Sequence, residues 1–178
     1  MKTALIPGSF DPFTLGHKNV VTRALTLFDR VVVAVMNNSG KEYMFSAEER
    51  VKIAKLTLSG LRRVKVIYCP GMTYELFRET GACAIVKGIR NASDLRYEIP
   101  QYEFNREAGG CETVFLPSDP EFSGLSSTGV RNMLQGEGRR VSRGALLRRM
   151  DASACAYIAS LGRFPRIAAP FELRDSER

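Results

Sequence analysis

The sequence predicts a single-domain α/β protein of the Rossmann-like type, with a doubly wound parallel sheet and helices on both faces. Short, unbroken apolar runs rich in Val and Ile recur along the chain, as expected for strands that are buried on both faces of a parallel sheet. Segments with helical periodicity lie between these runs, and right-handed crossovers of this kind build a doubly wound sheet. With 178 residues and 44% hydrophobic content, the chain suits one core rather than two.

The expected strands and helices alternate in order. The strands are expected at residues 3–6, 31–36, 64–68, 84–86 and 114–116, and the helices at 17–28, 46–59, 73–80, 93–107 and 126–135. Ser46 marks the start of the second helix, because Glu49 three residues later completes a capping box. A last helix is expected over about 144–161. The folded domain is therefore expected to span residues 1–161, and residues 162–178, which mix prolines and charges, to form a loosely packed or frayed tail.

Composition narrows the classes of function. The four cysteines stand far apart without a C-x-x-C pair, and the chain has a single histidine, so disulfide and zinc sites are disfavoured. No apolar run approaches the length of a membrane span and the first residues lack a signal-peptide pattern, which predicts a cytoplasmic protein that does not engage a membrane. A net charge of +7 fits either nucleic-acid binding or an enzyme for polyanionic small molecules.

The most informative segment is the Gly- and Pro-rich turn of residues 7–16, which joins the first strand to the first helix. The only histidine of the sequence, His17, stands where this helix begins. A helix start presents unpaired N–H groups and the positive end of a dipole, and an imidazole can add a hydrogen bond to the same phosphate oxygens. The turn therefore predicts a nucleotide site. A hydrolytic triad of Ser9, Asp11 and His17 is disfavoured, because the segment does not resemble a nucleophile elbow.

Three further loops are expected at the same edge of the sheet, where ligands of doubly wound folds bind. Lys41 follows the second strand, and residues 87–90 carry two cations after the fourth. Residues 126–128 place three hydroxyls at the start of the helix after the fifth strand, with Arg131 one turn along. Three hydroxyls exceed what capping needs and would suit a phosphate. The sequence contains neither a P-loop nor a dinucleotide-binding fingerprint.

Together, these motifs resemble the bacterial phosphopantetheine adenylyltransferases. The resemblance rests on residues 7–12 with Gly16 and His17, on 44–45 with 48–50, on Gly88 and Arg90 with Asp94, Tyr97 and Glu98, and on 126–128. It runs in order from residue 1 to about 160. The resemblance implies transfer of AMP from ATP to 4′-phosphopantetheine, a Rossmann-like fold, use of Mg²⁺ and a homohexameric assembly, with no nucleic-acid partner.

The resemblance also implies roles for individual residues. His17 and Lys41 match catalytic positions, with His17 binding the phosphates and stabilising the pentacovalent transition state. The positions that match contacts to the pantetheine phosphate are Ser9, Lys41, Thr73 and Lys87. Those that match ATP contacts are Ser9, Phe10, His17, Gly88, Ile89, Arg90, Glu98, Phe122, Ser123, Gly124, Leu125, Ser126, Ser127 and Thr128. Lys87 stands where the family usually has arginine, so its grip on the acceptor phosphate would be a point-charge contact.

Two alternatives remain open at this stage. Another nucleotidyltransferase of the same superfamily could act on nicotinamide mononucleotide or glycerol 3-phosphate, although residues 87–98 favour the pantetheine enzyme. A basic nucleic-acid-binding module could use the arginine cluster of residues 139–149, but base-stacking aromatics are not interleaved there.

Overall fold

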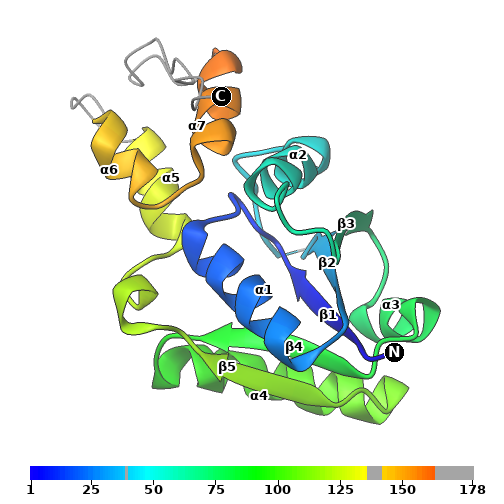
Figure 1. Ribbon diagram of the computed structural model, residues 1–178. Helices are drawn as coiled ribbons and strands as arrows, with labels where there is room; N and C mark the ends of the chain where they lie inside the picture. Colours follow the sequence, from blue (N-terminus) through cyan, green and yellow to red (C-terminus); the bar gives the residue numbers. More distant parts are fainter. Residues whose placement is uncertain (39, 136–141, 163–178) are drawn as a thin grey trace.

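A five-stranded parallel sheet forms the centre of the molecule (Figure 1), in a computed structural model that describes residues 1–38, 40–135 and 142–162. The strand order is β3-β2-β1-β4-β5, and every pairing is parallel. The strands are β1 (Thr3–Gly8), β2 (Arg30–Met36), β3 (Val64–Cys69), β4 (Ala84–Ile89) and β5 (Thr113–Pro117). The order reverses between β1 and β4, so the predicted doubly wound sheet is confirmed and its switch point lies beside the first turn.

Helices cover both faces of the sheet. In Figure 1, α1 passes in front of the strands and α4 lies behind them. The helices are α1 (Leu15–Leu27), α2 (Ala47–Thr57), α3 (Thr73–Thr80), α4 (Ala92–Gly109), α5 (Ser127–Gln135), α6 (Arg143–Leu147) and α7 (Ala152–Ser160), with a short 3₁₀ turn η1 at Pro120–Phe122. No helix within the described ranges is long and apolar enough to cross a membrane.

Two apolar cores follow from the alternation of side chains along the strands. Ile6 and Val33 point to the face covered by α1, α2 and α5–α7, whereas Leu5, Val32 and Ala34 point to the face covered by α3. All five side chains are buried. The strands are apolar on both faces for this reason, which explains why they appear in the sequence as unbroken runs.

Most predicted boundaries agree with the structure to within a few residues. The capping box at α2 is confirmed, since the Glu49 N–H donates to Ser46 Oγ at 3.3 Å and the Ser46 N–H donates to Glu49 Oε2 at 2.9 Å. The single helix expected over 144–161 is wrong, because α6 and α7 are separate. Asp151 caps α7 by accepting the Ser153 N–H at 3.0 Å. The expected tail lies outside the described residues from 163 onward.

The break between α6 and α7 has a tertiary cause. The carbonyl of Arg149 accepts the Leu15 N–H at 2.8 Å, so this connection binds the first turn of α1 rather than continuing a helix. Met150 is fully buried beside it. The C-terminal helices are thereby attached to the start of α1, which carries His17.

Candidate active site

The carboxyl ends of β1, β2, β4 and β5 open onto one cleft with a volume of about 1250 Å³. The four loops that the sequence analysis singled out all line it. The sequence-predicted residues in its lining are Ser9, Phe10, His17, Lys41, Thr73, Lys87, Gly88, Arg90, Glu98, Phe122, Leu125, Ser126, Ser127 and Thr128. Ile89, Ser123 and Gly124 do not line it. The Ser123 hydroxyl instead donates to the Pro120 carbonyl at 2.8 Å within the η1 turn.

His17 is held at the start of α1 in one defined tautomer. Its Nδ1 accepts the backbone N–H of Thr14 at 3.0 Å, and Thr14 Oγ1 lies 3.2 Å from the same nitrogen. Because the Thr14 N–H can only donate, Nδ1 carries a lone pair and the neutral ring bears its proton on Nε2. The rings of Phe10 and Phe13 flank the imidazole, each with a centroid separation of 5.1 Å. The Nε2–H is therefore a fixed donor in the cleft.

The imidazole is neutral at physiological pH. Removal of the ring from solvent, with a smaller contribution from the charge of Arg90, lowers the pKa of His17 from 6.5 to about 4. A neutral donor gives up no proton near pH 7. The geometry thus suits hydrogen bonding to an oxygen on which negative charge develops, rather than proton transfer.

Two lysines line the cleft, Lys87 on β4 and Lys41 on the loop after β2. The Lys87 ammonium lies 2.9 Å from Glu98 Oε2, and both side chains are less than a fifth exposed, at 16% and 17%. Lys41 Nζ lies 5.4 Å from the centroid of the Tyr97 ring. Within the described part of the chain, no carboxylate forms an ion pair with Lys41. Lys41 therefore offers an unpaired positive charge to an anionic ligand.

Arg90 is fixed by two segments at once. Its guanidinium contacts Asp94 through Nε at 2.8 Å and Nη2 at 2.9 Å, while Nη1 donates to the Leu125 carbonyl at 3.1 Å. The bidentate pair raises the pKa of Arg90 and lowers that of Asp94. The loop after β4 and the start of α5 are joined by this guanidinium.

The three hydroxyls at the start of α5 do not share one task. Ser126 Oγ accepts the Gly129 N–H at 3.0 Å as an N-cap, and Thr128 Oγ1 accepts from Arg131 Nη2 at 3.0 Å. Ser127 Oγ donates to the Pro12 carbonyl at 2.8 Å. Ser126 and Thr128 each retain an O–H donor for a ligand. The hydroxyl of Ser127 instead ties α5 to the first loop.

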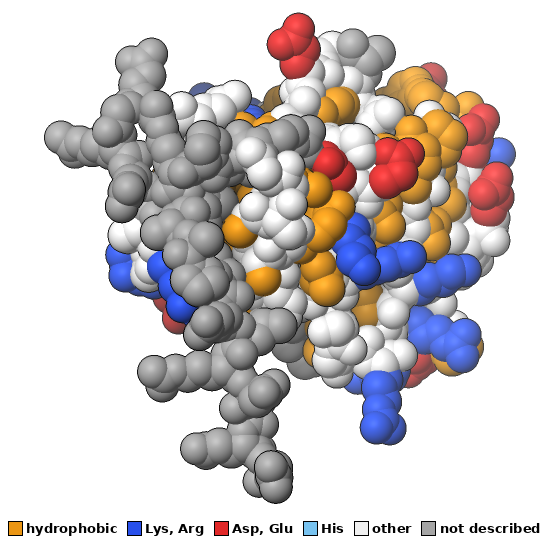
Figure 2. All heavy atoms as spheres, turned by 90° about the horizontal axis from the view of Figure 1, so that it is seen from above, with side chains coloured by type: hydrophobic (Ala, Val, Ile, Leu, Met, Phe, Trp, Pro, Cys, Tyr) orange, Lys and Arg blue, Asp and Glu red, His pale blue; other side chains and the backbone are white. Residues whose placement is uncertain are grey.

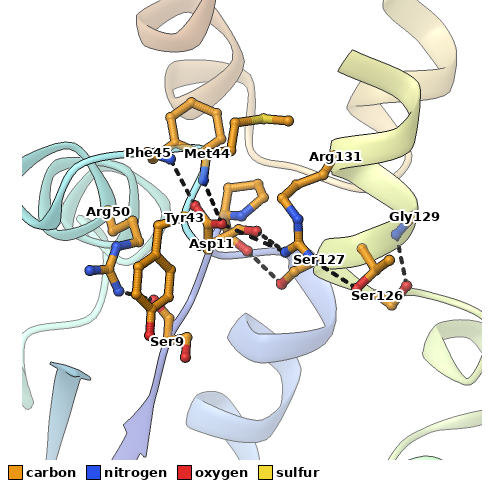
Figure 3. Close-up of polar contacts among 12 residues, drawn as sticks. Ser9, Asp11, Tyr43, Met44, Phe45, Arg50, Ser126, Ser127, Gly129 and Arg131 are labelled. Carbon is orange, nitrogen blue, oxygen red and sulfur yellow. Dashed lines mark hydrogen bonds and ion pairs between the residues drawn. The ribbon is translucent and has the colours of Figure 1, made fainter. Parts of the chain in front are cut away.

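A buried carboxylate on the first loop contacts the segment before α2 and the helix α5 (Figure 3). Asp11 accepts the N–H groups of Met44 and Phe45, each at 3.0 Å, and its Oδ2 lies 3.7 Å from Arg131 Nη1. The same Nη1 donates to the Asp11 carbonyl at 2.6 Å. Asp11 is 3% exposed and its carboxylate contacts these groups rather than His17, which removes it from any hydrolytic triad.

Two glycines of the site are explained by close packing. A Cβ on Gly88 would stand 2.6 Å from Val20 Cγ2, so α1 can approach β4 only because residue 88 has no side chain. A Cβ on Gly8 would stand 2.8 Å from the Phe10 ring. Helix packing by itself therefore already requires glycine at position 88.

The described residues do not form a protein cage for a metal ion. No group of three or more His, Cys, Asp or Glu side chains in the described ranges is arranged for one. Four carboxylates line the cleft, and those of Asp11, Asp94 and Glu98 are each engaged by a cation on the protein, which leaves Glu42 as the one without an ion pair among the described residues. A Mg²⁺ ion in this cleft would have to be held mainly by phosphate oxygens and water, which is a common arrangement for this ion.

Sequence reasoning missed some residues that shape the cleft. Thr14, which sets the tautomer of His17, and Tyr97, which supports Lys41, were not assigned roles. Thr14 and His17 stand in the spacing of a capping box, with His in place of the usual Glu or Gln, and this signal could have revealed the contact. The contacts of Arg50 with β1 and β2 leave no trace in the sequence.

Comparison with known proteins assigns the chain to a family. Residues 5–133 match the cytidylyltransferase-like family model. The phosphopantetheine adenylyltransferase of Renibacterium salmoninarum is 46% identical over 143 residues, covering 80% of this chain and 89% of that protein. The phosphopantetheine adenylyltransferase of Micrococcus luteus is 42% identical over 157 residues, covering 86% of this chain and all of that protein.

The chain belongs to the phosphopantetheine adenylyltransferase family. The Rossmann-like fold agrees with this membership. A solved structure of a putative nicotinate-nucleotide adenylyltransferase from Vibrio parahaemolyticus has a TM-score of 0.65 at 18% identity, and the match covers 94% of this chain and 98% of that one. The match to the Vibrio structure supports the fold alone, whereas the curated phosphopantetheine adenylyltransferases share both sequence and length with this chain.

Proposed function

We propose that the chain transfers AMP from ATP to 4′-phosphopantetheine, giving dephospho-coenzyme A and pyrophosphate in coenzyme A synthesis. The observation that carries the proposal is the convergence of cationic and hydroxyl groups from four loops beside one neutral imidazole, in a family whose curated members are named for this reaction. The cleft, at about 1250 Å³, exceeds the usual 300–1,000 Å³ of a site for one small molecule. It has room for a nucleotide and an acceptor together.

The chemistry is a direct in-line displacement. An oxygen of the acceptor phosphate attacks the α-phosphorus of ATP and forms a P–O–P bond. The bond from the α-phosphorus to the bridging oxygen breaks, and pyrophosphate leaves with that oxygen and its electron pair. The attacking phosphate is already an anion, so the reaction needs neither a covalent intermediate nor a strong base. Positioning and stabilisation of charge supply the catalysis.

The residues divide between the two substrates. His17 donates its Nε2–H to an α-phosphate oxygen, where negative charge grows in the transition state. The remaining nucleotide phosphates bind the guanidinium of Arg90 and the start of α5, where the hydroxyls of Ser126 and Thr128 donate to them. The other residues assigned to the nucleotide are Ser9, Phe10, Gly88, Ile89, Glu98, 122–125 and Ser127.

On the acceptor side, Lys41 attracts the phosphate with an unpaired ammonium, and Ser9, Thr73 and Lys87 complete the subsite. Lys87 is already paired with Glu98, so its charge is shared between this carboxylate and the incoming phosphate. Lys41 therefore supplies the larger part of the attraction for the acceptor.

Three further properties belong to the proposal. ATP enters as its Mg²⁺ complex, in which the ion neutralises phosphate charge, and no residue of the chain is assigned to it. The active protein is a homohexamer, which light scattering after size exclusion tests directly. The activity resides in the cytoplasm.

The test is pyrophosphate release with a panel of acceptors. Purified protein receives Mg²⁺-ATP with 4′-phosphopantetheine, nicotinamide mononucleotide or glycerol 3-phosphate, and mass spectrometry identifies the adenylylated product. Selective release with 4′-phosphopantetheine is expected. Release with another acceptor alone would assign the chain to a different nucleotidyltransferase.

The nucleic-acid alternative has its own outcome. On the face shown in Figure 2, Lys and Arg side chains gather beside hydrophobic and acidic ones, a pattern that suits anionic small molecules as well as a nucleic acid. A salt-sensitive gel shift combined with no pyrophosphate release from any acceptor would favour this alternative.

A further inference from the structure

Arg50 is fully buried at the start of α2, with 1% of the residue exposed. Its Nη1 donates to the carbonyl oxygen of Ser9 at 2.7 Å and to that of Met36 at 3.0 Å, and its Nη2 donates to Asn37 Oδ1. These acceptors lie at the carboxyl ends of two adjacent strands, β1 and β2. One guanidinium therefore fixes the points at which both strands leave the sheet and enter the cleft loops.

The charge of Arg50 is not explained by an ion pair. Across residues 1–38, 40–135 and 142–162, no carboxylate lies within ion-pair distance of it, and its Nε has no hydrogen-bond partner. Burial of a cation is costly even where a carboxylate such as that of Glu48 interacts with it from beyond ion-pair distance, and an apolar side chain of similar volume is often tolerated equally well or better. Stability alone does not explain arginine at this position.

A second contact connects Arg50 to the loop that carries Lys41. The ring of Tyr43 lies on the guanidinium, 4.1 Å from its central carbon to the ring centroid (Figure 3). The Tyr43 hydroxyl accepts the Asn38 N–H and donates to the Asn38 carbonyl. The same carbonyl accepts the Lys41 N–H at 3.0 Å. The guanidinium, the ring and this turn form one connected unit.

We propose that Arg50 is a positioning residue for the acceptor phosphate. It sets Ser9, on the loop after β1, and Lys41, on the loop after β2, at a fixed separation on either side of the attacking oxygen. The inference rests on the proposed function. The planar guanidinium of Arg50 donates to acceptors on both strands while its face packs against the Tyr43 ring. The ammonium group of a lysine could not make both kinds of contact.

The test compares two substitutions with a matched control. Arg50→Lys keeps the charge without the fork, and Arg50→Met removes both. Ile53→Val serves as the control, because Ile53 is equally buried on the same helix but its apolar side chain forms no hydrogen bond to either loop. Since a displacement of about 1 Å can reduce rates by roughly 10²-fold, Arg50→Met should lower kcat/KM for the acceptor by about 10- to 100-fold. Arg50→Lys should lower kcat/KM for the acceptor by a smaller factor. Ile53→Val should change this parameter by less than about twofold, since a buried Ile→Val substitution is mild.

Two further measurements separate positioning from loss of structure. The dissociation constant for ATP should stay within about threefold in both Arg50 variants, because His17 and Arg90 are held by other contacts. In the Lys41→Ala background, Arg50→Lys should have a smaller effect than in wild type, since Lys41, one of the two residues through which Arg50 acts, is gone and only Ser9 remains. The proposal is overturned if the acceptor and ATP parameters fall together, or if the two substitutions combine as independent losses.

A readout without activity keeps this inference distinct from the proposed function. Trypsin cleaves after Lys41, and the rate of cleavage at this bond reports how firmly its turn is held. Arg50→Lys should raise the rate of cleavage by about tenfold, which corresponds to a loss of about 1.4 kcal/mol in the free energy of local opening. Ile53→Val should leave the rate unchanged. If wild-type protein fails to adenylylate 4′-phosphopantetheine, the proposed function fails. Equal cleavage of the Arg50 and Ile53 variants overturns the positioning role whatever the substrate.

Discussion

Substitution of His17 should separate two functions of one ring. In His17→Ala the Nε2–H donor is lost, and kcat should fall by about 10²- to 10³-fold, or roughly 2.7–4 kcal/mol, the scale for one donor to a developing charge. The Nδ1 acceptor is lost as well. The N–H of Thr14, a residue that is 1% exposed, then has no partner, which should lower the free energy of unfolding by about 1–3 kcal/mol.

His17→Asn distinguishes the two losses. The side-chain carbonyl of asparagine at this N3 position can accept the Thr14 N–H, as Glu or Gln does in a capping box, so most of the stability should return. The shorter side chain does not present a donor where Nε2 stands, so kcat should remain low. Stability is measured by urea unfolding, and turnover by pyrophosphate release with both substrates saturating.

The dissociation constant for ATP, measured by calorimetry, should change far less than kcat in both His17 variants. A kcat for His17→Ala within about threefold of wild type would refute the role in the transition state. Full activity in His17→Asn would show instead that the residue serves only to cap α1.

Three other predictions test the surroundings of the ring. Lys41→Ala should reduce kcat/KM for the acceptor by at least about 10²-fold, which is the scale expected for the loss of a charged contact. The matched control is Lys52→Ala, since Lys52 is an exposed lysine on α2 that lies outside the cleft. Gly88→Ala should lower the unfolding free energy by about 1–3 kcal/mol through overpacking against the stiff Val20, and adding Val20→Ala should restore part of it. Because His17 binds protons less readily folded than unfolded, its contribution to stability is complete above pH 6.5 and is lost as the pH falls towards 4, so urea midpoints should fall less over this range in His17→Asn.

Much of the fold could be predicted from sequence, because its signals are local. The buried strands appear as apolar runs. The start of α2 is marked by Ser46 and Glu49, a signal contained in four consecutive residues. The convergence of four loops also followed from the sequence, since parallel topology brings the carboxyl ends of the strands to one edge.

The remainder depended on contacts between distant segments. Helical periodicity continues through 148–151, but the Arg149 carbonyl binds the Leu15 N–H and the helix breaks there. The requirement for glycine at position 88 comes from Val20 on a different element. Arg50 could be recognised only within a matching motif, because its acceptors are backbone carbonyls, which every residue possesses.

The ring of His17 gives the most direct test of the central claim, that a neutral imidazole with a fixed Nε2–H donor stands beside the triphosphate. As the sequence contains one histidine, ¹⁵N NMR of tag-free protein yields a single pair of ring signals. The account predicts a protonated Nε2, an unprotonated Nδ1, a titration midpoint of about 4, and a shift of the Nε2 signal when ATP is added. A protonated Nδ1, a midpoint near 6.5, or a ring unaffected by saturating ATP would contradict it.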